Sequence, residues 1–194
     1  MLPILFFLLV ATLYPFGIGP DGALLERTGG GMLWIAALLA ALLPVDRLIA
    51  PDAESGVFDQ LSIRGAGDEM VASAKILAHW LSFGPPLMIA AIPAAALLRL
   101  NESTLVQLEL GLLLGTPGLA ALAVMVAGIT AGLRSTGALA GLLMLPLAVP
   151  LLIFGAGSLG DTSGSALKLL GACSLLLCAI APFATGAAIK AMRD

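Results

Sequence analysis

The chain has 194 residues, of which 60% are hydrophobic and only 11% are charged, and its mean hydropathy is +1.09. A soluble domain carries roughly 25% charged residues because much of its surface faces water. This composition therefore excludes an ordinary soluble globular domain and predicts a protein whose solvent is lipid. The net charge of −3, without a basic patch, also argues against a nucleic-acid partner.

Six apolar segments follow one another along the chain, each close to the roughly 20 residues that a membrane-spanning helix needs. In lipid an unpaired backbone group is costly, so each segment is expected to be helical. The sequence thus predicts an all-α, polytopic membrane protein with six transmembrane helices in a single domain. The expected spans are residues 2–19, 30–49, 72–98, 105–133, 136–157 and 167–189.

Prolines interrupt several of these spans. A proline inside a helix removes a backbone donor and bends the helix. We therefore expect kinks in the third, fourth and fifth spans, at Pro85, Pro86, Pro117, Pro146 and Pro150. Glycines four residues apart, such as Gly111 and Gly115, allow helices to approach closely.

The distribution of Lys and Arg predicts the orientation, because cytoplasmic loops carry an excess of positive charge. Arg27, Arg99 and Lys168 fall on one side of the predicted membrane. Twice as many fall on the other side, namely Arg47, Arg64, Lys75, Arg134, Lys190 and Arg193. The larger group places the loop 50–70 and both termini in the cytoplasm.

The sequence contains no motif for ATP binding, covalent haem attachment, zinc hydrolysis or a serine nucleophile. It contains a single histidine, so one copy cannot supply a bis-histidine or three-histidine metal site. Cys173 and Cys178 share one apolar segment and are expected to be small buried side chains. We therefore expect no catalytic residues and no metal site, and any energy for transport must come from a partner.

The longest hydrophilic segment runs from Asp46 to Lys75. Val57, Phe58 and Leu61 in it form one apolar edge of a predicted short helix, which the glycines after Arg64 end. Asp68 is then expected to cap the next helix. Such a helix suits docking of a soluble ATPase, and it equally suits a helix lying flat on the membrane surface.

Several motifs in order along the chain resemble those of one family. They are TLYPFGIGP at 12–20, AKILAHW at 74–80, LGTP at 114–117, LPLAVPLLIF at 145–154 and APFAT at 181–185. Their order and spacing over all six spans are similar to those of cytochrome c maturation protein B (CcmB). That family comprises the membrane subunits of a haem-export ABC transporter.

The resemblance implies an ABC-2-like permease bundle in the bacterial inner membrane, present as two copies per complex. Its implied partners are the ATPase CcmA, the membrane proteins CcmC and CcmD, and the haem chaperone CcmE. Haem would be a transported or handled ligand rather than a covalently bound cofactor, supplied to the periplasm for cytochrome c assembly. The implied ATPase-coupling residues are Gly56, Phe58, Asp59, Gln60 and Leu61.

His79 and Trp80 are the candidates for a haem path, because an imidazole can ligate iron and an indole can stack on the ring. The competing interpretation is that His79 bonds a neighbouring helix and Trp80 anchors the interface. Two other functions also fit the sequence. One is a non-conducting scaffold that couples ATP hydrolysis to release of haem-loaded chaperone, and the other is an ABC-2-like permease for a different substrate.

Overall fold

The computed structural model describes residues 2–19, 21–131 and 136–193. Arg134, one of the cations used to predict the orientation, lies outside the described residues. All regular structure in these ranges is helical, which confirms the predicted all-α fold. The elements are α1 (Leu2–Ile18), α2 (Gly22–Leu42), η1 (Val45–Arg47), α3 (Ala50–Glu54), α4 (Val57–Ile63), α5 (Asp68–Leu97), α6 (Glu102–Thr130), α7 (Thr136–Gly157), η2 (Ser158–Gly160) and α8 (Ser165–Arg193).

Five helical segments in the described ranges, containing α2, α5, α6, α7 and α8, are long and apolar enough to cross a membrane. α1 is also apolar but has 17 residues. At 1.5 Å per residue, a helix of that length extends about 25 Å, slightly less than the hydrocarbon core of about 30 Å. The chain is therefore a multi-pass membrane protein.

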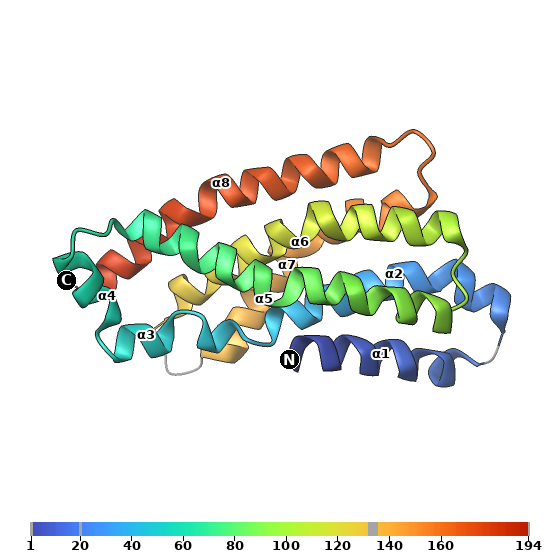
Figure 1. The fold of residues 1–194 in the computed structure, drawn as a ribbon, viewed down its shortest axis with the longest axis horizontal. Coiled ribbons are helices and arrows are strands. Elements are labelled where there is room, and N and C mark those ends of the chain that lie inside the picture. The colour runs from blue at the N-terminus through green and yellow to red at the C-terminus, as the bar shows by residue number, and fades with distance from the viewer. Residues whose placement is uncertain (1, 20, 132–135, 194) are drawn as a thin grey trace.

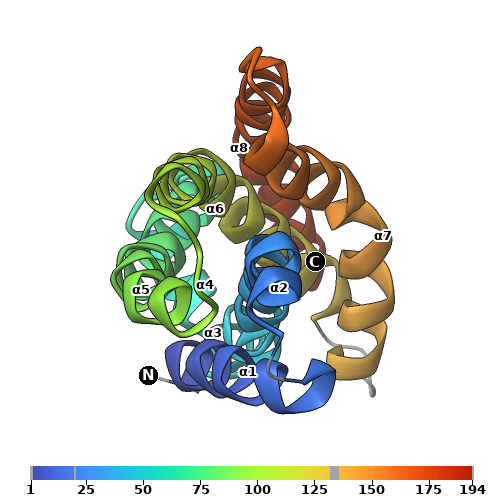
Figure 2. The same ribbon diagram turned by 90° about the vertical axis from the view of Figure 1, so that its right-hand side faces the viewer.

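The long helices run side by side along the longest axis of the molecule (Figure 1). Seen down that axis, α2 lies at the centre, with α1, α5, α6 and α7 around it (Figure 2). α6 supplies much of the core, because most of its side chains from Leu108 onward are buried. α8 packs on the outside of α6, and its N-terminal half leans away from the other helices (Figure 2).

The two ends of this bundle differ in structure. At one end lie α3, α4 and the C-terminal end of α8, and we call it the α4 end (Figure 1). At the opposite end lie the connections from α1 to α2, from α5 to α6 and from α7 to α8, and we call it the loop end. Charged contacts between helices are found at both ends, and the middle of the bundle is apolar.

Side-chain caps set where α2 and α6 begin. The Asp21 carboxylate accepts hydrogen bonds from the backbone N–H groups of Ala23 and Leu24, at 3.0 and 3.3 Å. Asn101 caps α6 in the same way through the N–H of Thr104, at 2.8 Å. These bonds satisfy amide groups that the first turn leaves unpaired. As a result α2 begins at Gly22 rather than near residue 30, where the predicted second span began.

The prolines that were expected to bend the spans lie inside continuous helices. Pro85 and Pro86 are in α5, Pro117 is in α6, and Pro146 and Pro150 are in α7. Neighbouring helices in a membrane bundle compensate for the missing donors. The kinks themselves stay a prediction.

Candidate functional site

The hydrophilic hairpin at the α4 end carries the residues that the sequence assigned to ATPase coupling. Gly56 precedes α4 with a φ of +72°, a left-handed conformation that glycine adopts without strain. Phe58 then points inward and is only 3% exposed. Asp59 and Gln60 are exposed, whereas Leu61 is half-buried against the core.

The predicted apolar edge of this short helix therefore holds it to the bundle. Phe58 and Leu61 belong to the packed core and do not face outward. The outward side of α4 consists of Asp59, Gln60 and Ile63, and the Ile63 side chain is 86% exposed. Sequence periodicity located α4 correctly, but it could not show which neighbour its apolar edge contacts.

One ion pair attaches this hairpin to α5, and a second joins α8 to the start of α5 beside it. Lys75 of α5 pairs with Asp52 of α3. Arg193, in the last turn of α8, pairs with Asp68 in the first turn of α5, with 2.8 Å between Nη2 and Oδ2. Asp68 was expected to cap α5. The N-cap is instead Gly67, and the Asp68 carboxylate binds the guanidinium.

Close backbone contact accompanies the Arg193–Asp68 pair. A Cβ atom on Gly186 of α8 would lie 3.1 Å from the backbone nitrogen of Glu69 and 3.2 Å from the backbone carbon of Asp68. Glycine is therefore needed for α8 to approach the first turn of α5 this closely. The end of α8 and the start of α5 are therefore packed directly against each other beside the hairpin.

His79 lies further along α5 and is 4% exposed. Its ring is 4.8 Å from that of Phe83, measured between centroids, and the backbone of Ala41 lies close enough to bond to it. Among the residues that the structure describes, the Nε2 atom has no hydrogen-bond partner. A buried imidazole nitrogen in this state is exceptional, because most buried polar atoms are paired.

A cavity of about 480 Å³ opens beside this histidine near the α4 end. Its lining combines apolar side chains with His79 and with the charged groups of Arg47, Lys75 and Asp46. Asp52 already neutralises Lys75, whereas Arg47 forms no ion pair within the described ranges. The cavity, which we call the inner pocket, thus has a buried histidine in its wall and one cation without an ion pair in the described ranges.

Trp80 faces a different part of the bundle. Its indole N–H donates a hydrogen bond to the Thr116 hydroxyl of α6, at 3.0 Å. Its ring lines a separate cavity of about 240 Å³ with Pro117 and Pro182. The two neighbours in sequence therefore do not share one cavity. Trp80 thus joins α5 to α6, whereas His79 lies within bonding reach of the α2 backbone at Ala41, as the competing interpretation expects.

Sequence reasoning missed both ion pairs, Lys75 with Asp52 and Arg193 with Asp68. The distribution of Lys and Arg predicts on which side of the membrane each charged residue lies, and it does not predict which residues form pairs. The specific pairing depends on how α8 crosses α5, which the sequence pattern does not encode.

Comparison with known proteins identifies the family. Residues 1–192 match the CcmB protein family. The heme exporter protein B of Rhodobacter capsulatus is 45% identical over 190 residues, which cover 95% of this chain and 87% of that protein. The protein of that name from Paracoccus denitrificans is 45% identical over 194 residues, with coverage of 97% and 89%. The one from Escherichia coli K12 is 39% identical over 193 residues, with coverage of 97% and 88%. With a family match along almost its whole length, this chain belongs to the CcmB family.

Proposed function

We propose that this chain is the membrane subunit of an ABC-type complex that exports haem for the assembly of c-type cytochromes. The name shared by its relatives, heme exporter protein B, supports haem as the substrate. The orientation predicted from charge places the α4 end in the cytoplasm of a bacterial cell, with the bundle across the inner membrane. Haem would then be delivered to the periplasm.

The observation that carries this proposal is the unpaired Nε2 of His79 beside the inner pocket. Haem presents an iron that binds imidazole, a large apolar ring and two carboxylates. The inner pocket offers an imidazole, apolar walls that include Leu43 and Leu48, and the Arg47 guanidinium. Guanidinium groups bind carboxylates through paired hydrogen bonds. The donor set therefore suits this substrate.

The chain has no nucleotide-binding motif, so ATP hydrolysis is assigned to a partner ATPase, CcmA. Its docking surface would be the outward side of α4, with Asp59, Gln60 and Ile63 exposed. Gly56 permits the turn into α4, and Phe58 and Leu61 hold the helix in place. CcmC, CcmD and the haem chaperone CcmE complete the proposed complex, with two copies of this chain.

The test is the substitution His79→Ala in cells that assemble c-type cytochromes. Loss of the imidazole should lower the yield of cytochrome c, because the inner pocket loses its iron ligand. Co-purification with CcmA should stay unchanged, since His79 lies away from α4. Trp80→Phe is the matched control, because it removes the bond to Thr116 without touching the inner pocket. A normal cytochrome c yield with His79→Ala would contradict the proposal.

One observation favours a second function. The Arg193–Asp68 pair and the contact at Gly186 hold α8 against the start of α5, and Arg193 also donates to the Phe58 carbonyl of α4. A rigid connection of this kind suits a scaffold that transmits ATP-driven motion and releases haem-loaded chaperone without conducting haem. Haem absorbance in a purified complex of this chain with CcmA, without CcmC, separates the two. A haem-binding complex supports conduction, and a complex free of haem supports the scaffold.

A further inference from the structure

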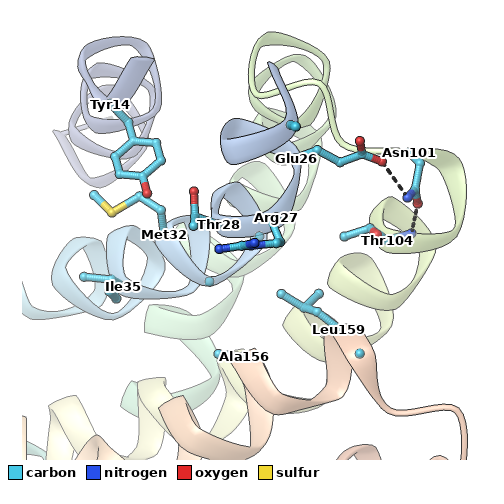
Figure 3. A pocket seen from close by; sticks show the side chains of 14 residues that line it. Tyr14, Glu26, Arg27, Thr28, Met32, Ile35, Asn101, Thr104, Ala156 and Leu159 are labelled. Atoms are coloured by element: carbon cyan, nitrogen blue, oxygen red, sulfur yellow. Dashed lines mark hydrogen bonds between the residues drawn. The ribbon is translucent and has the colours of Figure 1, made fainter. Parts of the chain in front are cut away.

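A second and larger cavity, of about 800 Å³, opens at the loop end of the bundle (Figure 3). We call it the outer pocket. It lies between α1, α2, the start of α6 and the end of α7, and no residue lines both this pocket and the inner pocket. Among its lining residues are Tyr14, Arg27, Met32, Ile35, Ala156 and Leu159.

The outer pocket contains a cation without a counter-ion. Within the ranges that the structure describes, Arg27 forms no ion pair. The adjacent acid, Glu26, is held by the side-chain amide of Asn101, at 2.9 Å between Oε1 and Nδ2. In Figure 3 the Glu26 and Arg27 side chains extend to opposite sides of α2. The guanidinium is therefore available to a ligand.

Part of the wall is apolar, although the polar side chains of Glu26, Thr28, Asn101 and Thr104 also line the pocket. Met32 of α2 lies beside Tyr14 of α1, Ile35 follows further along α2, and Ala156 and Leu159 lie on the other side of α2 (Figure 3). Tyr14 adds an aromatic ring whose hydroxyl points toward Met32 (Figure 3). Gly31 lines the same space, and a Cβ atom at this position would have no neighbour within 4 Å. The pocket thus combines one exposed cation with apolar side chains.

We propose that the outer pocket binds an amphipathic anion, with its carboxylate or phosphate on Arg27 and its apolar part against Met32 and Ile35. Two sources have this chemistry. One is haem, whose propionates would bind Arg27, and this source rests on the proposed function. The other is an anionic phospholipid, whose phosphate would bind the guanidinium while an acyl chain fills the apolar part.

Two substitutions test the site without disturbing the fold. Gly31→Leu fills the pocket, and the open space around Gly31 accommodates the new side chain. Arg27→Ala removes the charge. Gly17→Leu is the control for the first, because Gly17 also has nothing within 4 Å of its Cβ position and lies outside the pocket. Lys168→Ala is the control for the second, because it removes an exposed cation from the same end of the bundle.

Two probes distinguish the sources. The full chain in phosphatidylcholine nanodiscs is titrated with haemin and followed by absorbance. In parallel, nanodiscs of mixed phosphatidylcholine and phosphatidylglycerol are analysed by native mass spectrometry for retained phosphatidylglycerol. Loss of one charge-assisted contact should weaken binding of the true ligand about tenfold or more. Both Gly31→Leu and Arg27→Ala should produce this loss, and both controls should behave as the unchanged chain.

Each outcome decides the proposal. Weaker haemin binding in the two pocket variants assigns haem to the outer pocket, and lower phosphatidylglycerol retention assigns phospholipid. Unchanged binding of both probes, or equal losses in the controls, overturns the site. His79→Ala in the same titration keeps the two proposals apart. If that variant binds haemin normally while the pocket variants do not, the inner pocket fails as a haem site and the outer pocket stands.

Discussion

Arg193 and Asp68 are 125 residues apart in sequence and form an ion pair, with 2.8 Å between Nη2 and Oδ2. Their side chains are 20% and 16% exposed. Arg193 also donates a longer hydrogen bond, of 3.4 Å, to the backbone carbonyl of Phe58. A single side chain at the end of α8 therefore contacts both α4 and the start of α5.

Arg193→Ala should destabilise the protein by removing these contacts. A partly exposed pair of this kind contributes about 1 kcal/mol. For a chain of this size, that loss corresponds to a midpoint lower by about 2–4 °C in thermal unfolding. The measurement is a melting curve in detergent. Lys190→Ala, which removes an exposed cation from the same end of α8, should leave the midpoint unchanged.

A double-mutant cycle tests whether the two side chains interact as the structure indicates. Asp68→Ala should cost a similar amount, and the double variant should be no less stable than the worse single variant. High salt removes the coupling energy between two side chains only where the ion pair is mainly exposed to solvent. Strictly additive losses would show that Arg193 acts through other contacts.

Substitutions on the outward side of α4 should detach the ATPase. Ile63→Asp changes a side chain that is 86% exposed, so it carries little folding cost. It should lower co-purification of CcmA about tenfold or more, because an unpaired charge would be buried in the contact. Gln60→Arg should act in the same direction.

The control for docking is a comparable change at the loop end. Glu102→Arg alters an exposed residue of α6 far from α4 and should leave CcmA bound. Leu61→Asp is a poorer choice, because Leu61 packs on the core and the change would also destabilise α4. Normal recovery of CcmA with Ile63→Asp and Gln60→Arg would move the docking surface away from α4.

Asp161, in the connection before α8, should make stability depend on acidic pH. The backbone N–H of Ala166 donates to its carboxylate at 2.7 Å, and Ser163 donates through both its backbone N–H and its hydroxyl. These bonds, that of Ala166 above all, hold the pKa of Asp161 well below its ordinary value of 3.8. Because the folded pKa is lower than the unfolded one, the stabilisation is complete above the ordinary pKa and is lost as pH falls below it.

Asp161→Ala measures that contribution. The unfolding midpoint of the variant should fall below that of the unchanged chain at pH values above about 4 and should approach it in more acidic buffer. Thr162→Ala, at the adjacent exposed position, has no titrating group and should show a constant difference across the same range. A difference for Asp161→Ala that does not change with pH would exclude ionisation as its source.

The sequence predicted the helices well because their length and hydrophobicity follow from the membrane alone. It also predicted α4, because Gly56 and the glycines after Arg64 limit the length of the helix between them. The predicted second span began at residue 30 because the charged Glu26 and Arg27 precede the apolar segment. In the structure these two residues lie on a continuous helix that Asp21 caps, and Gly29 and Gly30 allow it close contact with the side chains of Leu98 and Leu159.

The candidate site was less predictable, because its parts come from different helices. His79 was selected as a polar group in an apolar span, and the structure places it beside a cavity with Arg47. Trp80 was predicted to share the haem path with His79 because the two residues are adjacent in the sequence. Successive residues on a helix point about 100° apart, so the two face different partners. Arg27 and its outer pocket gave no signal, since the pocket exists only where α1, α2 and α7 meet.

Trp34 provides the sharpest test of the packing at the centre of the bundle. Its side chain is 1% exposed and is surrounded by glycines of two other helices. Cβ atoms on Gly155, Gly115 and Gly111 would lie 2.6, 2.7 and 3.0 Å from atoms of the indole. A methyl group in any of these positions would overlap the ring, which is why small residues are needed there.

Gly155→Ala should therefore destabilise the protein by about 1–3 kcal/mol, the usual cost of overpacking a core. Gly157→Ala in the same helix is the matched control, because its Cβ position has no neighbour within 4 Å. That change should be neutral or slightly stabilising, since alanine favours a helix more than glycine does. Adding Trp34→Leu to Gly155→Ala should recover part of the loss, because the smaller side chain makes room for the methyl group. Melting curves in detergent measure all four proteins, and equal midpoints for the two alanine variants would mean that the indole does not pack against Gly155.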